Sequence, residues 1–387
     1  MSEFNFDDIR PYTEEEAQEA IKRIVVQDEL RTILEYLFGK GNHTDLTKLA
    51  SEAVSIADFQ KKFMKPLVLK ILGDTSDGLS TSGFDSSADI SRLYIANHRD
   101  ITLDSSILAS VLVEKNKEAC EFTWGDNLMV SPFVTDMGKI NRMITVFREG
   151  KPRETLYNAQ KLSAYIRKKI TKDNHSVWIA QRKGRAKDGN DKTDVGVLKM
   201  LSLSGEGDLI TRLMALNITP VSISYEWEPC DARKIREIYI SQSKNYVKTQ
   251  NEDLQSIIGG ILSKKGRIHI AMGKSINHEY NKINKGLPNN ELLQQIAHLI
   301  DIEIYRNYRL WPTNFLAYDL LHKTQQFTDH YTEGTKIGFE ERMKQAVAGK
   351  DGDKSDAIEL FLKMYSQPVI NKLQYDLPPD EPKSEKN

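Results

Sequence analysis

Short runs of strand-forming residues alternate with longer helical patterns through the middle of this 387-residue chain. The strand patterns cover residues 93–96, 143–147, 177–180, 218–225 and 267–272. Helical patterns lie between them, for example over residues 103–115, 153–170 and 231–241. Alternation of this kind is typical of α/β domains, in which helices connect the strands and cover the sheet. It therefore predicts an α/β fold with a mixed, largely parallel sheet and helices on both faces.

Helical patterns also flank this central region. Thr13 and Glu16 fit a capping box at the start of an amphipathic segment, and the chain is again helical from about residue 281 to about residue 373. The last eleven residues carry three prolines among charged residues, as disordered tails do. We therefore predict a helical N-terminal region (1–77), the α/β domain (78–280), a helical C-terminal region (281–375) and a disordered tail (376–387).

One segment of the N-terminal region, residues 59–72, is both basic and apolar. It contains Phe59, Phe63 and Leu67 together with four lysines. Such a segment can be a core helix whose lysines reach solvent, or an interfacial segment that inserts its apolar side chains into a membrane surface. The sequence leaves both interpretations open.

The distribution of charge limits the classes of partner. The formal net charge is only −1, so a chain-wide basic surface for nucleic acid is absent and no nucleic-acid partner is expected. Residues 139–187, however, contain fourteen basic and three acidic residues, whereas residues 1–19 contain seven acidic residues and one basic residue. A local positive field in a neutral chain indicates an anionic ligand or an anionic surface.

Several absences in the sequence lead to expectations about location and metals. The first residues show no export signal, and no run of about 18 apolar residues predicts a membrane span. The two cysteines, Cys120 and Cys230, are far apart and fit a reducing compartment. The histidines show no metal-ligand spacing with cysteines or acids, so we predict no metal site. The chain is expected to be cytoplasmic, or peripheral on the inner face of a membrane.

The first chemical signal is a histidine at the end of a strand. His98 follows the strand pattern at residues 93–96, and Asp100 and Asp104 come just after it. In α/β sheets, ligands bind at the carboxyl ends of the strands. A carboxylate can hold an imidazole in one tautomer, so that its other nitrogen serves as a general base near neutral pH. The spacing leaves open which of the two aspartates would do so.

This segment and four later ones resemble, in order, the blocks of the glycerol-phosphate acyltransferases. This superfamily includes glycerol-3-phosphate and 1-acyl-glycerol-3-phosphate acyltransferases. The resemblance covers residues 80–275, and the matching segments are 95–104, 144–148, 177–186, 218–226 and 266–273. It implies the fold described above and a hydroxyl acceptor that is deprotonated by His98.

The resemblance also implies roles for individual residues. Asp104, which opens a helix as the family's aspartate does, would orient His98, with Asp100 as the alternative because the loop has one residue more than the family's. The phosphate of the acceptor would be bound by basic residues and a glycine of the second and third blocks, namely Arg148, Arg182, Lys183, Gly184 and Arg185. Pro220 of the fourth block would shape the substrate-side strand. The family's usual glutamate is absent near Arg182, so the contacts to substrate differ there.

The expected function is transfer of a fatty acyl chain from acyl-CoA or acyl carrier protein to a glycerol-phosphate-type acceptor. The favoured acceptor is 1-acyl-glycerol-3-phosphate, followed by glycerol-3-phosphate and then a lyso-aminolipid. The mechanism implied is general-base catalysis without a covalent acyl-enzyme, without a cofactor and without a metal, and its setting is phospholipid synthesis at an anionic membrane surface. A catalytically idle lipid- or membrane-binding protein of the same fold is the alternative.

Overall fold

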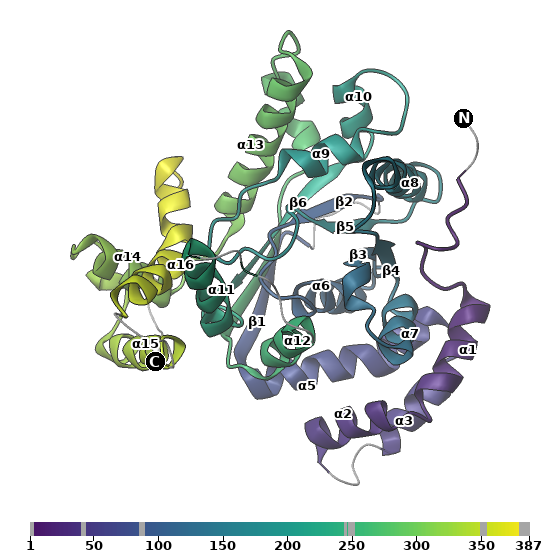
Figure 1. Ribbon diagram of the computed structural model, residues 1–387, viewed down its shortest axis with the longest axis horizontal. Helices are drawn as coiled ribbons and strands as arrows, with labels where there is room; N and C mark the ends of the chain where they lie inside the picture. The colour runs from purple at the N-terminus through teal and green to yellow at the C-terminus, as the bar shows by residue number, and fades with distance from the viewer. Residues whose placement is uncertain are drawn as a thin grey trace.

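In the computed structural model, which describes residues 4–39, 44–84, 90–243, 246, 252–348 and 354–378, seven strands form one sheet. Their order across the sheet is β1-β7-β6-β2-β5-β3-β4 (Figure 1). The strands are β1 (Ser76–Ser82), β2 (Leu93–Ala96), β3 (Glu121–Gly125), β4 (Met143–Val146), β5 (Val177–Ala180), β6 (Ile218–Tyr225) and β7 (Gly266–Met272).

The sheet is mixed and largely parallel, as the sequence predicts. Strands β2 to β6 all run in one direction, β7 is antiparallel to β6, and β1 is parallel to β7. The central strands β2 and β6 are buried along their whole length, as strands covered by helices on both faces are, and the polar side chains of Thr219, Ser222 and Ser224 in β6 are buried with the rest. Five of the strands lie where the sequence places them. The strand patterns found in the sequence include neither β1 nor β3.

Helices cover both faces of the sheet, and this confirms the predicted α/β architecture. On one face, an apolar cluster joins the sheet to α5 (Lys65–Thr75), α6 (Leu103–Glu114) and α7 (Pro132–Ile140). On the other, a second cluster joins it to α8 (Pro152–Thr171), α9 (Val195–Leu201), α10 (Leu209–Met214) and α13 (Asn289–Asn307). No helix among the described residues is both long and apolar enough to cross a membrane.

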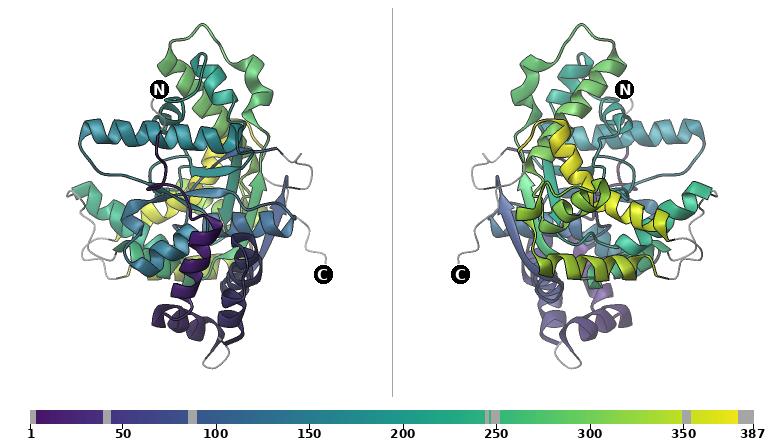
Figure 2. Two further views of the ribbon diagram at one scale, coloured as in Figure 1. Left: turned by 90° about the vertical axis from the view of Figure 1, so that its right-hand side faces the viewer. Right: turned by 90° about the vertical axis from the view of Figure 1, so that its left-hand side faces the viewer.

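The remaining helices lie beside this layered body. Figure 2 shows the purple N-terminal helices at one end of the molecule, and these are α1 (Glu14–Ile24), α2 (Asp28–Phe38), α3 (Thr44–Ser51) and α4 (Ile56–Phe59). Thr13 and Glu16 form the predicted capping box of α1. Later in the chain come α11 (Asp231–Ser243), α12 (Glu252–Leu262), α14 (Pro312–His322), α15 (Glu333–Ala346) and α16 (Ser355–Gln374). Residues 379–387 of the predicted tail lie outside the described residues.

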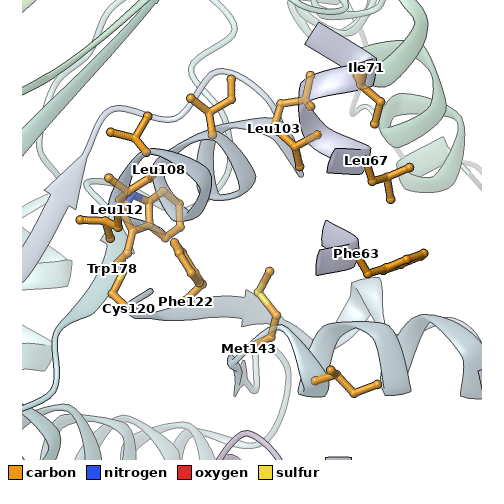
Figure 3. Packing of buried hydrophobic residues seen from close by; sticks show 14 of the residues in the cluster. Phe63, Leu67, Ile71, Leu103, Leu108, Leu112, Cys120, Phe122, Met143 and Trp178 are labelled. Atoms are coloured by element: carbon orange, nitrogen blue, oxygen red, sulfur yellow. The ribbon is translucent and has the colours of Figure 1, made fainter. Parts of the chain in front are cut away.

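The interfacial interpretation of residues 59–72 is wrong. Phe59, Phe63 and Leu67 are buried in the apolar cluster between the N-terminal helices, α5 and α6. Figure 3 shows Phe63, Leu67 and Ile71 within this cluster, which also contains Leu103 and Met143. The segment is therefore core, and its lysines are placed on the outer side by the helical period.

Part of the basic region at residues 139–187 is neutralised by the acidic N-terminus. Lys161 pairs with Asp8 at 2.7 Å, and the buried Lys139 donates to the carbonyl oxygens of Ile9 and Arg10 at 3.0 and 2.7 Å. The N-terminal segment also covers β4, since the amide of Thr145 donates to the carbonyl of Ile9 at 2.8 Å. These lysines fix the N-terminal segment and do not form an open anion-binding surface.

Candidate active site

The candidate site lies at the carboxyl edge of the five parallel strands. Because these strands run in one direction, the residues that follow each of them meet at the same edge of the sheet. His98 follows β2, Arg148 follows β4 and the loop with Arg182 and Arg185 follows β5. The topology therefore gathers residues that are up to 87 positions apart in the sequence (98 to 185).

His98 is bound to the carboxylate of Asp104. Its Nδ1 atom lies 2.8 Å from Oδ2 of Asp104, and its ring packs edge-on against Trp178 with 5.7 Å between the ring centroids. The side chain of His98 is 14% exposed, whereas that of Asp104 is 2% exposed. Among the described residues, no group forms a hydrogen bond with Nε2 of His98, which leaves this nitrogen free to bind a substrate.

Asp104 is held as an anion by four donors. Its Oδ2 accepts from His98 and from the backbone amides of Arg99 and Asp100, at 2.6 and 3.0 Å, and its Oδ1 accepts from the Tyr225 hydroxyl at 2.8 Å. Burial opposes ionisation, but the hydrogen bonds and charge of His98 and the two amides lower the pKa of Asp104 below its usual value. Nδ1 of His98 therefore carries the proton of this hydrogen bond, and Nε2 is the basic nitrogen.

Asp100 forms no hydrogen bond with His98 in the described part of the chain. Its Oδ1 accepts from the backbone amides of Thr102 and Leu103, at 2.9 and 2.8 Å, so this aspartate caps the start of α6. The geometry thus places Asp104, and not Asp100, against the imidazole.

Arg148 follows β4, the strand at the edge of the sheet, and its side chain lies against the neighbouring strand β3. In the strand order, β4 is three strands away from β2, which is roughly 14 Å at the usual strand spacing. The half-buried Arg148 side chain crosses the end of β3, because a Cβ atom on Gly125 would lie only 2.4 Å from its Nε. A glycine at position 125 leaves the space that this guanidinium occupies.

The loop after β5 contains the other four predicted anion-binding residues. Arg182 donates to the carbonyl of Asn190 at 3.3 Å, and Lys183 is exposed. Gly184 has a φ of +74°, a conformation that favours glycine, and no atom lies within 4 Å of where its Cβ would be. Arg185 is half-buried beside the turn of His98.

A backbone hydrogen bond joins this loop to the histidine. The amide of Ala186 donates to the carbonyl of His98 at 2.8 Å. Burial and the Asp104 carboxylate raise the pKa of Asp100, while the nearby Arg185 opposes the shift. Arg185 and the pair of His98 and Asp104 are thus parts of one compact site.

Pro220 lies away from these groups. It is the third residue of β6, in register with Ile95 of β2, and its carbonyl accepts from the amide of Gly273 at 2.8 Å. Pro220 thus lies inside a buried strand, and its role in shaping that strand stays a prediction.

Some residues of the site were not assigned a role from the sequence. Tyr225, at the end of β6, donates to Asp104, and Arg99 is enclosed by a buried cluster of charged residues that includes Asp191 and Glu228. The position of Arg99 directly after His98 was the one signal available, since the partners of its side chain come from positions 90 or more residues away.

No family model matches the chain, and no curated protein matches it. Among solved structures, the chain is similar to the 1-acyl-sn-glycerophosphate (LPA) acyltransferase PlsC from Thermotoga maritima. The similarity covers 73% of this chain and 89% of that chain, with 15% sequence identity and a TM-score of 0.33.

Proposed function

We propose that this protein is an O-acyltransferase that moves a fatty acyl chain from an acyl thioester to the hydroxyl of a glycerol-phosphate-type acceptor. The observation that carries the proposal is the 2.8 Å contact between Nδ1 of His98 and the buried Asp104, beside the loop with Gly184 and Arg185. The block pattern of the sequence supports the same class of enzyme. The favoured acceptor is 1-acyl-glycerol-3-phosphate, in phospholipid synthesis.

The proposed reaction uses His98 as a general base. Nε2 removes the proton of the acceptor hydroxyl while its oxygen attacks the carbonyl carbon of the thioester, an effect worth about 10²- to 10⁴-fold in rate. Asp104 stabilises the imidazolium that forms. The tetrahedral intermediate then expels the thiolate of CoA or acyl carrier protein, which takes the proton from the imidazolium. One C–O bond forms, one C–S bond breaks, and no acyl-enzyme is made.

The basic residues would bind the phosphate of the acceptor. Guanidinium groups bind phosphate oxygens through two parallel hydrogen bonds, which suits Arg148 and Arg185. Arg182, Lys183 and the open backbone of Gly184 would complete the phosphate site.

The test is an assay of the purified protein with one acyl-CoA and a panel of acceptors, read by product mass. We expect an ester product with at least one acceptor, and we expect His98→Ala to abolish it while the thermal melting curve stays normal. A folded His98→Ala variant with full activity would overturn the assignment of the base. Absence of any product, with liposome binding intact, would favour the idle lipid-binding protein.

We also propose that the protein docks reversibly on an anionic membrane surface at the inner face of the membrane, and that α12 makes the apolar contact. Leu254, Ile258 and Leu262 form a stripe at i, i+4 and i+8 on this helix and are 38% to 48% exposed. They lie opposite the small residues Ser256 and Gly260, which face the protein. Exposed cations border the stripe, with Arg233 bonded to Gln255 of α12 at 3.0 Å and Lys264 just beyond its end.

Vesicle co-sedimentation tests this docking site. Exchange of Leu254, Ile258 and Leu262 for serine should remove the part of the binding that resists high salt, because apolar insertion is not screened. The matched control exchanges Val26, Tyr36 and Val54, which are 67% to 80% exposed on the N-terminal region, and should bind as the parent does. Equal losses in both variants, or equal binding to neutral and anionic vesicles, would contradict the proposal.

A further inference from the structure

Four charged side chains form a closed cluster directly behind the candidate base. Arg99 pairs with Asp191 at 2.5 Å (Nη2 to Oδ2) and with Glu228 at 3.1 Å (Nη1 to Oε2), and Lys234 pairs with Glu228 at 2.5 Å. All four side chains are at most 5% exposed. Two cations and two anions balance one another, as buried charges must.

The cluster holds Arg99 by its backbone as well as its side chain. The Arg99 amide donates to Oδ2 of Asp104 at 2.6 Å, and its carbonyl accepts from Nζ of Lys234 at 2.6 Å. The Arg99 guanidinium also lies over the ring of Tyr308, with its Cζ atom 5.4 Å from the ring centroid. Since Arg99 is the neighbour of His98 in the sequence, fixing Arg99 fixes the peptide from which the imidazole projects.

The same cluster reaches the loop that contains Arg182 and Arg185. Arg99 donates to the carbonyl of Gly189 at 3.1 Å, and Asn97 donates to Oδ2 of Asp191 at 3.0 Å. Gly189 in turn lies against α16, because a Cβ atom at this position would be 2.1 Å from the carbonyl oxygen of Met364. One set of ion pairs thus connects three parts of the molecule. These are the turn that carries His98, the loop with Arg182 and Arg185 (the candidate phosphate loop) and the C-terminal helices.

We propose that Arg99, Asp191 and Glu228 are positioning residues, which fix the pair of His98 and Asp104 and set its distance from the phosphate loop. The expected change in kcat rests on the proposed function, whereas the expected change in the position of the His98 imidazole does not. A buried ion cluster tolerates few alternative arrangements, because moving one member leaves another charge unpaired in a medium of low polarity. It is therefore suited to hold a catalytic pair in a single geometry.

The experiment compares Asp191→Asn with Glu121→Gln. Glu121 is a matched control, because it is also a buried carboxylate that pairs with one cation, Lys169 at 2.9 Å, and accepts one further side-chain hydrogen bond, from Tyr165 at 2.7 Å. Glu121 is the first residue of β3, whereas His98 follows the last residue of the parallel strand β2. The two residues therefore lie at opposite ends of the strands. Both proteins are studied at a temperature at which urea titration shows them to be fully folded.

Two measurements are made on each variant. The first is the low-field proton resonance of the His98 Nδ1–H group, assigned by its loss in His98→Ala. The second is kcat and KM in the acyl-transfer assay. We expect Asp191→Asn to shift or remove the resonance and to lower kcat by about 10- to 100-fold, since small displacements of reacting groups have effects of this size. Glu121→Gln should leave both unchanged.

The outcomes separate this proposal from the proposed function. If the parent protein has no transferase activity, the resonance still tests whether Asp191 positions His98 without touching it. An unchanged resonance and unchanged kcat in folded Asp191→Asn would overturn the inference, and so would equal losses in the Glu121→Gln control. If Asp191→Asn does not fold, Glu228→Gln is the second variant, with the same expected result and the same contradicting one.

Discussion

Asp100 and Asp104 lie in the same buried turn, yet their surroundings give them opposite acid–base properties. Asp104 accepts four hydrogen bonds, including the one from His98, and its pKa is lowered. Asp100 uses only Oδ1, on two backbone amides, and its Oδ2 has no hydrogen-bond partner among the described residues. Burial and the neighbouring carboxylate raise the pKa of Asp100. Environment, and not residue type, distinguishes the two aspartates.

Exchanging each aspartate for asparagine tests this difference. In Asp104→Asn the imidazolium loses its stabilising charge, so we expect kcat to fall by about 10²- to 10⁴-fold with little change in KM. In Asp100→Asn the amide oxygen can still cap α6, and a much smaller loss is expected. Steady-state kinetics on both variants decides the matter. The reverse ranking would mean that Asp100 orients the base.

At this scale the sequence predicted the residues that are close together in the chain. The spacing after a strand predicted a contact between His98 and one of two aspartates, and the resemblance to the acyltransferases favoured Asp104, whose contact with His98 the geometry contains. Tyr225 and Asp191 could not be found in the same way, because they reach the site only through the strand order and a long loop. Nothing in the local pattern of the sequence distinguishes them from other polar residues near strand ends.

At the scale of elements, α12 is seated directly on the turn of the candidate site. The helix contacts the turn through Gly260, since a Cβ atom there would lie 1.9 Å from Oδ2 of Asp100. Its neighbour Gly259 faces Cys230, whose Sγ would be 3.5 Å from an added Cβ, an ordinary contact distance. Gly260 therefore lies too close to a buried carboxylate to accept a methyl group, whereas Gly259 has room for one.

The two glycines provide a paired test of how closely α12 approaches the site. Gly260→Ala should destabilise the protein by about 1–3 kcal/mol or more, because the methyl group overlaps a buried carboxylate held by the start of α6. Gly259→Ala should be neutral or stabilising by up to about 1 kcal/mol, since alanine favours the helix. Urea denaturation of both variants measures the difference. Equal stabilities would show that α12 does not pack on Asp100.

The elements that the sequence missed have physical reasons. β1 consists largely of serine, glycine and aspartate, and it is a strand because it pairs with β7, as in the pairing of Leu79 with Ile268. β3 begins with Glu121, whose charge is compensated by Lys169 from α8. For residues 59–72 the sequence left the environment open, because a pattern of apolar and basic residues cannot distinguish burial against a protein core from burial in a membrane surface.

At the scale of the whole molecule, the C-terminal helices are tied closely to the α/β body. Asp231 of α11 accepts from Arg342 of α15 at 2.6 Å and from Tyr365 of α16 at 2.8 Å. Figure 1 shows α14, α15 and α16 grouped beside α11. These contacts join α15 and α16 to α11, beside the candidate site. The predicted domain boundaries at residues 77, 280 and 375 stay predictions.

A buried carboxylate on α13 makes the stability of the molecule depend on pH. Asp301 is buried and accepts from the amide of Thr193, in the loop after β5, at 2.7 Å. Burial raises the pKa of Asp301 to about 6. The folded protein therefore binds a proton here at pH values at which the unfolded chain has already lost it. The stability that this proton contributes is present at low pH and is lost as the pH rises from about 4 to about 6.

Asp301→Asn isolates this effect. The amide oxygen can accept the same hydrogen bond from Thr193 without a charge, so the variant lacks the proton release while all other titrating groups are shared. A shift of about two pH units corresponds to up to about 3 kcal/mol. We therefore expect the free energy of unfolding of the parent protein, relative to that of the variant, to fall by up to this amount between pH 4 and pH 7, as measured by urea titration at each pH. The decrease should be complete by about pH 7, because the folded carboxyl group is then ionised. A difference that stays constant over this range, or one that grows in favour of the parent protein, would mean that Asp301 is ionised in the fold throughout.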